Sequence, residues 1–307
     1  MSVKKALLTA AILTSCFLLG VFFAQPDFLS RFSAQPTAEL PKAEAGEVVV
    51  REVALQDDFK GAKVAKDDLL QGCLGKDCIP SIDEPVFETA EEADAWLEPE
   101  DRVFALDYRG VQRAYPQRIM NWHEIVNDEV DGIPIAVTFC PLCGSAVAFE
   151  RHVDGVITEF GVSGKLHNSD LVMYDRYEGN LWQQITGEAI VGPAAQRDEV
   201  LTAVPIITTS WEQWQAEHLE TEVLSRETGV ERDYDQYPYG TYEQDDEIYF
   251  EVGNLDATLP YKEVVYGVDL YGAAKAYPES AFDDEEIITD MLGGVQLTLM
   301  REPDGEI

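Results

Sequence analysis

The stretch Ile135-Ala-Val-Thr-Phe-Cys-Pro-Leu-Cys-Gly-Ser-Ala146 leads an apolar, β-branched run into a turn that carries two cysteines. The run predicts a buried strand, while Pro141 and Gly144 favour the turn, because proline fixes one backbone dihedral and glycine permits an unusual one. A turn at a strand end can aim Cys140 and Cys143 at one point, where thiolates bind a soft metal ion or exchange with a disulfide. The pair therefore predicts a metal-binding or thiol-redox site.

The same pair also has a structural interpretation, as a disulfide or as two buried thiols. A zinc ribbon would need a second pair at suitable spacing, and the sequence has none. Cys73 and Cys78, in Gly-Cys-Leu-Gly-Lys-Asp-Cys, predict a short-range disulfide that staples a loop in an exported protein. A relay from these thiols to Cys140 and Cys143 is the open alternative.

An internal duplication is the second feature, because residues 103–139 align with residues 265–301 without a gap. The first copy predicts a β-hairpin, a helix opened by proline and a turn into a further strand. Identities shared by both copies have backbone or packing reasons, so they predict scaffold. The matched positions are Val103/Val265, Asp107/Asp269, Gly110/Gly272, Ala114-Tyr-Pro116/Ala276-Tyr-Pro278, Glu124-Ile125/Glu286-Ile287, Asp128/Asp290 and Gly132/Gly294.

Residues held only by the first copy are the better candidates for chemistry. They are Trp122, His123, Cys140 and Cys143, opposite Asp284, Glu285, Glu302 and Gly305 in the second copy. His123 is expected on a helix from Pro116 to about Asn127, packed on the strand that delivers the cysteines. A histidine there could serve as third metal ligand or as proton partner in catalysis, the alternative being a hydrogen-bonded core or surface histidine.

Between the two copies, the sequence predicts short strands separated by turn signals such as Asp154-Gly155. The fold class is therefore α+β and β-rich, with a short-stranded barrel- or sandwich-like core, a few short helices and the internal duplication. One helix is expected over Ser210–His218, with Ser210 and Gln213 forming a capping box. The strands expected in this segment are Ala146–Glu150, Val156–Val162, Leu171–Asp175 and Leu181–Ile185.

Several side chains of this segment could complete a site at the cysteines. His167 or Met173 would give a copper(I)-like ligand set. Core packing is the alternative for Met173 and for the tryptophan in the Trp-Gln-Gln184 stretch. The candidates for lining a cofactor or ligand pocket are Trp122, Trp182, Gln183, Asn168 and Asp170.

The charge balance of the 307-residue chain is strongly acidic, with 58 acidic against 22 basic residues and a formal net charge of -36. Such a surface repels phosphates, so nucleic-acid binding is excluded, and it keeps a protein soluble at high ionic strength. The Tyr- and Asp-rich stretch 232–246 predicts a long loop with solvated carboxylates rather than a calcium site.

Residues 1–24 predict a signal or membrane-anchor segment, because two lysines precede the apolar run 6–23. The run is long for a signal-peptide core and barely long enough to span a membrane. Phe22 stands where a cleavage site needs a small residue, which favours an uncleaved anchor. A lipoprotein interpretation of Cys16 is disfavoured by the apolar residues after it. The positive-inside rule places the rest of the chain outside the cytoplasm, in a periplasmic or extracellular compartment.

Six strings in this order resemble the family catalogued as domain of unknown function 3179: Ala-Tyr-Pro116, Trp-His-Glu-Ile-Val-Asn-Asp128, Cys-Pro-Leu-Cys-Gly144, Phe-Gly-Val-Ser-Gly164, Asn-Ser-Asp-Leu-Val-Met-Tyr-Asp-Arg176 and Trp-Gln-Gln-Ile-Thr-Gly187. The resemblance implies an exported bacterial or archaeal protein and no established activity. The expected division is a signal or anchor segment over 1–24, a tether and cysteine loop over 25–78 and the family domain over 79–307.

Two functional hypotheses follow. The first is a membrane-tethered, extracytoplasmic metal-binding or thiol-redox protein that uses Cys140 and Cys143 with His123, and in which copper or zinc is the expected ion. The second is a non-catalytic scaffold whose cysteines form a structural disulfide and whose groove binds a cell-envelope ligand. Neither hypothesis identifies a protein or small-molecule partner, and both leave open whether the protein is an enzyme.

Overall fold

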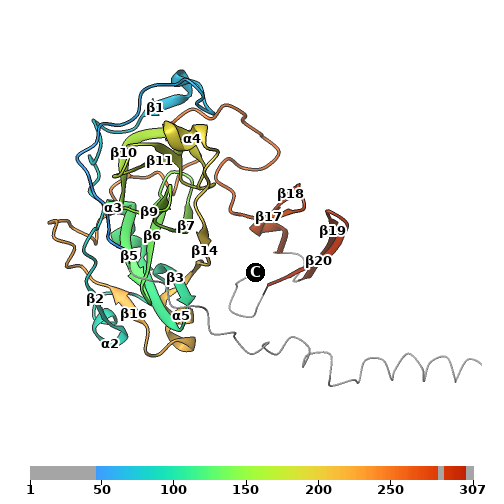
Figure 1. Cartoon of the computed structure of the whole chain (residues 1–307). Helices are drawn as coiled ribbons and strands as arrows, with labels where there is room; N and C mark the ends of the chain where they lie inside the picture. Colours follow the sequence, from blue (N-terminus) through green and yellow to red (C-terminus); the bar gives the residue numbers. More distant parts are fainter. Residues whose placement is uncertain (1–45, 283–286, 302–307) are drawn as a thin grey trace, which may run out of the picture. The chain divides into compact units, whose positions relative to one another are not determined.

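The computed structural model describes residues 46–282 and 287–301, and three sheets dominate the first range (Figure 1). Sheet A has the order β1 (Leu69–Gln71), β10 (Phe160–His167), β11 (Asp170–Asp175), β12 (Leu181–Gln183), β13 (Ala189–Val191). Sheet B has the order β14 (Ala203–Val204), β7 (Ser145–Glu150), β6 (Ile133–Cys140), β5 (Ile125–Val130). Sheet C has the order β15 (Ile207–Ser210), β3 (Arg102–Tyr108), β4 (Val111–Pro116), β16 (Glu222–Leu224), β2 (Phe87–Thr89).

The described residues also contain short helices, 3-10 turns and a small hairpin. They are α2 (Ala90–Ala93), α3 (Gln117–His123), α4 (Pro193–Gln196), α5 (Trp211–Glu217), the 3-10 turns η2 (Lys66–Asp68) and η3 (Glu279–Phe282), and the pair β8 (His152–Val153) and β9 (Val156–Ile157). The prediction of an α+β, β-rich fold with short strands and few short helices is confirmed. The capping box of α5 is present as well, because the Ser210 side chain accepts from the Gln213 backbone N–H.

The N-terminal segment 1–24, with Cys16, lies outside the described residues. So do the second-copy positions Asp284, Glu285, Glu302 and Gly305. In the ranges 46–282 and 287–301, no helix is long and apolar enough to cross a membrane.

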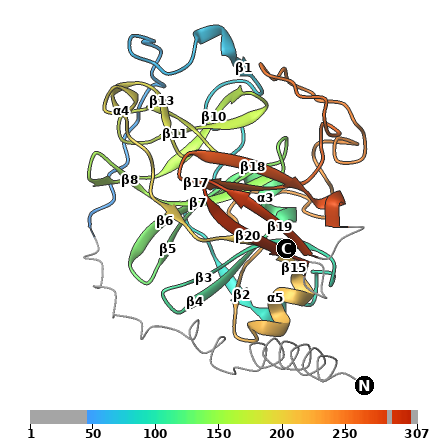
Figure 2. The same cartoon turned by 90° about the vertical axis from the view of Figure 1, so that its right-hand side faces the viewer.

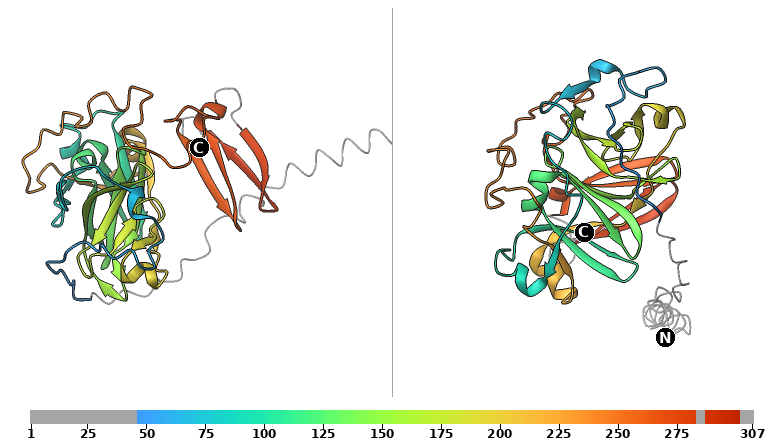
Figure 3. Two further views of the ribbon diagram at one scale, coloured as in Figure 1. Left: turned by 90° about the horizontal axis from the view of Figure 1, so that it is seen from above. Right: turned by 60° about the vertical axis from the view of Figure 1, so that its left-hand side comes forward.

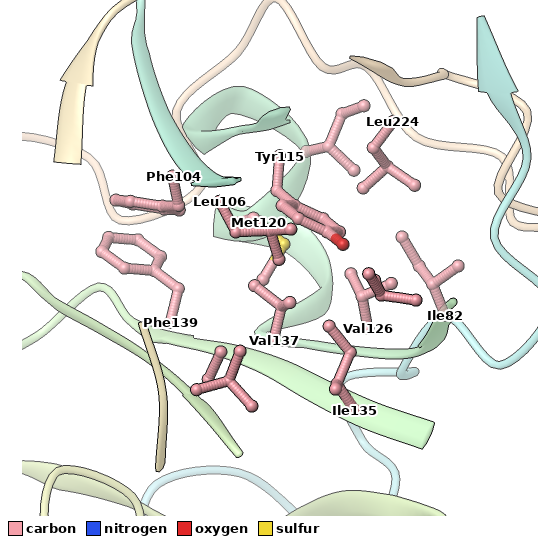
Figure 4. Packing of buried hydrophobic residues seen from close by; sticks show 14 of the residues in the cluster. Ile82, Phe104, Leu106, Tyr115, Met120, Val126, Ile135, Val137, Phe139 and Leu224 are labelled. Carbon is pink, nitrogen blue, oxygen red and sulfur yellow. The ribbon is translucent and has the colours of Figure 1, made fainter. Parts of the chain in front are cut away.

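Strand β6 explains why the run that leads to the cysteines is apolar without interruption. Successive side chains of a strand point to opposite faces, and both faces of sheet B are covered. Val137 packs with Phe104 of sheet C in the cluster drawn in Figure 4. Ala136 and Cys140 point the other way and pack in a second cluster with Met173 of sheet A. Every residue of β6 after the first is therefore buried.

The helix α3 ends at His123 and does not reach Asn127 as predicted. Glu124 has a left-handed backbone with φ of 59°, and β5 begins directly after it. Ile125 and Val126 are β-branched and fill the two clusters on opposite faces of sheet B. Their packing and the ladder to β6 favour a strand over continuation of the helix.

The second copy repeats the strand pairing of the first. It forms two hairpins, drawn in red in Figure 2 and seen from two further sides in Figure 3, in which β17 (Val265–Leu270) pairs with β18 (Ala273–Pro278) and β19 (Ile287–Leu292) pairs with β20 (Val295–Met300). Val265 lies opposite Pro278 as Val103 lies opposite Pro116, and Ile287 lies opposite Met300 as Ile125 lies opposite Thr138. The duplication is therefore present in the backbone as well as in the sequence.

One ion-pair network is also repeated. Tyr115 donates to Asp128 at 2.6 Å, and Arg113 binds the same carboxylate at 2.8 Å. In the second copy, Asp290 is bound by the corresponding residues, Tyr277 and Lys275. These shared polar residues hold one hairpin to the next, which agrees with the scaffold interpretation.

The predicted tether and cysteine loop is partly packed. The part over 25–45 lies outside the described residues, but Val53, Leu55 and Phe59 pack against the cluster around Tyr174 and Ile190. The disulfide predicted between the next two cysteines, Cys73 and Cys78, is present.

Candidate functional site

The turn between β6 and β7 places both cysteines of the pair. The carbonyl of Cys140 accepts from the Gly144 N–H at 2.9 Å, and Gly144 has φ of 66°, which glycine adopts without steric cost. Cys140 is fully buried, Cys143 is exposed, and both are free thiols. The turn therefore presents one buried and one accessible sulfur.

A third group that could bind a metal comes from the hairpin between β10 and β11. Its turn residues Asn168 and Ser169 both have positive φ, as a two-residue hairpin turn requires, and Asp170 follows directly. The thiol of Cys143 donates to Asp170 Oδ1 at 3.2 Å, and the thiol of Cys140 donates to the Ser169 carbonyl at 3.8 Å. The sulfurs of Cys140 and Cys143 and a carboxylate oxygen of Asp170 lie within 4.8 Å of one another.

Neighbouring polar groups fix this arrangement. The Gln183 amide and the Ile185 backbone N–H both donate to the second oxygen of Asp170, the latter at 3.2 Å. Ser145 shares a hydrogen bond of 2.9 Å with the sulfur of Cys143. One carboxylate oxygen is thus held by the protein, and the other faces the thiols.

The site is acidic, and two of its three groups, Cys140 and Asp170, are buried. Burial raises the pKa of the Cys140 thiol well above its usual range, and its hydrogen bond with Cys143 and the charges of Cys143, Asp170 and Glu124 raise it further. Burial also raises the pKa of Asp170, although hydrogen bonds from Cys143, Ile185 and Gln183 act in the opposite direction. Because thiols and carboxylates bind metals in deprotonated form, a cation among them would replace these protons.

Glu124 is a further acidic group beside the site. Burial raises its pKa to about 7, a hydrogen bond from Tyr239 lowers it, and the charge of Asp170 raises it. The Tyr239 hydroxyl donates to the carboxylate at 2.9 Å. The backbone carbonyl of Glu124 accepts from the Phe139 N–H at 2.8 Å, which ties it to β6 one residue before Cys140.

A tyrosine-rich stretch that overlaps the predicted long loop (232–246) contacts this region, and we call residues 234–249 the tyrosine segment. Tyr239 reaches Glu124, and Tyr242 donates to the Leu142 carbonyl, between the two cysteines, at 2.8 Å. Tyr242 is buried, and Lys262 lies over its ring at 3.6 Å from the centroid. The segment therefore contacts the cysteine turn at Leu142.

His123 is held away from the thiols. Its Nδ1 bonds the Pro80 carbonyl at 2.8 Å, so Nδ1 carries the proton, and Nε2 accepts from the Tyr234 hydroxyl at 2.7 Å. Burial lowers its pKa, the hydrogen bond to Pro80 raises it, and the charge of Arg232 lowers it. The structure does not bring His123 into the ligand group, and both ring nitrogens already have partners.

The other predicted site residues lie at varied places. Trp182 donates to Asp175 at 2.8 Å and packs with Met173 in the apolar cluster around Cys140, which matches the alternative of core packing for both. Trp122 donates to the Gln236 carbonyl at 3.0 Å. The predicted residues His167 and Gln183 are hydrogen-bonded to each other, from Nδ1 to Oε1 at 2.6 Å. Asn168 Oδ1 accepts from the Gly253 backbone N–H at 3.0 Å.

Sequence reasoning missed Glu124, Ser145 and the two tyrosines Tyr239 and Tyr242. Glu124 was assigned to scaffold because the second copy has Glu286 at the matching position. Ser145 follows the Cys-x-x-Cys-Gly string directly and could have been found by asking what flanks the second thiol. The tyrosines carried no such signal, since their approach depends on a loop path.

The family model described as "Protein of unknown function (DUF3179)" matches residues 76–307. No curated protein and no solved structure matches the chain.

Proposed function

This chain belongs to the DUF3179 family, and because the family name assigns no chemistry, we propose a function from the site alone: binding of a soft metal ion, preferably zinc, by Cys140, Cys143 and Asp170. The observation that supports this proposal most strongly is that the two thiol sulfurs and an oxygen of the buried Asp170 carboxylate lie within 4.8 Å of one another. Three acidic groups this close repel one another when ionised, and a dication relieves that repulsion.

The electrostatics favour metal binding over a reactive thiol. Catalytic cysteines lie in electropositive surroundings that lower the thiol pKa. Here burial and the acidic neighbours Asp170 and Glu124 raise the pKa of Cys140. Such a thiol is a poor nucleophile in the absence of a cation, but it becomes a thiolate when a metal displaces the proton.

The ligand types favour zinc over copper. Zinc accepts sulfur, nitrogen and carboxylate oxygen together, whereas copper(I) prefers thiolate and thioether. Asp170 supplies a carboxylate oxygen, and Met173 is a core residue with no exposed surface. Three protein ligands would leave one position of a tetrahedral zinc ion for water or another ligand.

An extracytoplasmic location completes the proposal. The Cys73–Cys78 disulfide fits an oxidising compartment. The apolar run in residues 6–23 would tether the domain to the membrane, with the metal site outside the cytoplasm. Such a protein would hold or hand on zinc at the cell envelope.

Metal content of the full chain tests this proposal. Elemental analysis after growth with zinc should give one zinc per chain, and cobalt(II) substitution should give thiolate-to-cobalt absorption. Cys140→Ser/Cys143→Ser should abolish both signals, and Asp170→Asn should weaken binding by more than about tenfold.

Two variants serve as matched controls. Cys73→Ser/Cys78→Ser removes the same number of cysteines elsewhere and should keep the metal. His123→Gln should also keep it, because His123 is outside the ligand group. Loss of metal in His123→Gln, or retention in Asp170→Asn, would contradict the assignment of ligands.

Thiol–disulfide exchange is the second candidate, favoured by one observation: both thiols are free and one is exposed. In that case, the protein would contain no zinc, and a mild disulfide oxidant would join Cys140 to Cys143 reversibly. Zinc that protects both thiols from this oxidant would support the metal site instead.

A further inference from the structure

Sheet A places three polar residues of the predicted site together. In the β10–β11 hairpin, His167 lies opposite Asp170. On the next strand, Gln183 lies opposite Val172, which is two residues beyond Asp170. Residues opposite each other, and residues two apart along a strand, share one face of a sheet. The side chains of His167, Asp170 and Gln183 therefore lie on the same face.

His167 fixes the orientation of the Gln183 amide. The Oε1 of Gln183 faces His167 Nδ1 at 2.6 Å, and its Nε2 donates to the His167 carbonyl at 3.4 Å and to an oxygen of Asp170. Reversing the amide would set its oxygen against a carbonyl and a carboxylate, which both only accept. His167 therefore donates from Nδ1, and the Gln183 amide donates to Asp170.

Hydrogen bonds from the protein fill one oxygen of the Asp170 carboxylate. Oδ2 accepts from Gln183 Nε2 and from the Ile185 backbone N–H, the latter at 3.2 Å. A carboxylate oxygen has about two acceptor positions, so both positions on Oδ2 are used. Oδ1 faces the thiol of Cys143 at 3.2 Å, and it is the oxygen that Asp170 can offer to a metal ion.

A carboxylate that offers one oxygen favours an ion that takes few ligands. Zinc is usually tetrahedral, whereas larger cations take more ligand atoms and often both oxygens of one carboxylate, as calcium does. Cadmium is a larger dication that also binds thiolates. We propose that His167 and Gln183 are positioning residues, which hold Asp170 to one-oxygen binding and so favour zinc relative to cadmium. This inference rests on the proposed metal site.

The assignment gives His167 a role other than the predicted one of ligand. His167 is not in the ligand group, and its Nδ1 is bonded to Gln183. Without the Gln183 donor, Asp170 Oδ2 would keep only the Ile185 N–H and would have an acceptor position for an ion. The carboxylate could then offer both oxygens to a large cation.

Competition between zinc and cadmium on the full chain tests the proposal. A Cys16→Ser background leaves Cys140 and Cys143 as the free thiols. Each metal is titrated against a chelator of known affinity, and thiolate-to-cadmium absorption reports cadmium binding. Gln183→Met keeps the length of the side chain but has no donor, so the ratio of the cadmium to the zinc association constant should rise by about tenfold or more. His167→Leu should raise this ratio as well.

Two further variants separate positioning from a general structural effect. His167→Asn has an amide N–H near the place of the imidazole Nδ1, so it should keep the wild-type ratio. Gln215→Met removes an amide that donates to both oxygens of Asp94 at 2.9 Å, outside the ligand group, and it should also keep the ratio. Circular dichroism confirms that each variant is folded.

The outcomes distinguish this inference from the proposed function. A wild type that binds zinc, with the same metal ratio as Gln183→Met and His167→Leu, would overturn the inference and leave the proposed function in place. A ratio in His167→Asn equal to that in His167→Leu would overturn the role of the Nδ1 donor. A wild type that binds no zinc would overturn both the proposed function and this inference.

Discussion

Replacing Glu124 with glutamine should remove a pH-dependent loss of stability from the protein. Glu124 is buried, and its pKa is raised from 4.5 to about 7, first by burial and then by the charge of Asp170. Its carboxyl therefore binds a proton more tightly in the folded than in the unfolded chain. The stability from this proton is fully present below pH 4.5 and is lost as pH rises through about 7.

The size of the effect follows from the two pKa values. One pKa unit is worth about 1.4 kcal/mol, so the rise from 4.5 to about 7 corresponds to about 3 kcal/mol in full. Integrating the proton linkage gives about 2.5 kcal/mol of this loss between about pH 5 and pH 8. Glu124→Gln keeps an acceptor for the Tyr239 hydroxyl but has no charge to bury, so it should lack this loss.

Urea unfolding of wild type and Glu124→Gln, metal-free and at several pH values from 5 to 8, measures the difference. The wild type should lose about 2.5 kcal/mol relative to the variant as pH rises. Glu100→Gln, which removes an exposed carboxylate, controls for the change in net charge. A difference in the free energy of unfolding between wild type and Glu124→Gln that is constant with pH would refute the reasoning. So would a wild type that gains stability relative to the variant as pH rises.

Three further outcomes are expected. Asp175→Ala should lower the free energy of unfolding in urea by on the order of 3 kcal/mol or more. The reason is that the Asp175 carboxylate accepts from three backbone N–H groups and from Asn180 and Trp182. A decrease below about 1 kcal/mol would contradict this expectation. Tyr239→Phe removes the hydrogen bond that lowers the pKa of Glu124, so the midpoint of the pH effect above should move upward, and a downward move would contradict this. Raising salt from about 0.1 M to about 1 M should raise the melting temperature of this chain of net charge -36, because the Debye length falls from about 10 Å to about 3 Å and the acidic residues repel one another less. An unchanged melting temperature would argue against self-repulsion.

The proposed metal site and the Glu124 effect are linked in a way that can be measured. A dication bound by Asp170 and Cys140 would favour the ionised form of Glu124 and so lower its pKa. The pH-dependent difference in the free energy of unfolding between wild type and Glu124→Gln should then become smaller when zinc is added.

Local sequence signals predicted the elements that short-range chemistry controls. The hairpin of β3 and β4 is set by the Arg109-Gly110 turn, and α5 is set by its capping box. The turn that holds Cys140 and Cys143 also follows from nearby residues. Each of these depends on dihedral preferences and hydrogen bonds within a few positions.

The end of α3 shows where local reasoning fails. The stretch after His123 was expected to remain helical, yet Ile125 and Val126 pack on opposite faces of sheet B. The residues that cover these two faces come from sheets A and C, which are formed by other parts of the sequence. Packing against distant residues therefore decided the boundary.

The sequence by itself determined the two thiols, the acidic surface and the duplication, because composition, spacing and identity are properties of the chain. It also nominated Asp170, although as a pocket residue and not as a metal ligand. Only the tertiary structure decided that Asp170 joins the thiols and that His123 turns to Pro80 and Tyr234. The physical reason is that ligand geometry and burial depend on contacts between β6, the β10–β11 hairpin and the tyrosine segment, which are far apart in the chain and meet only when the sheets pack.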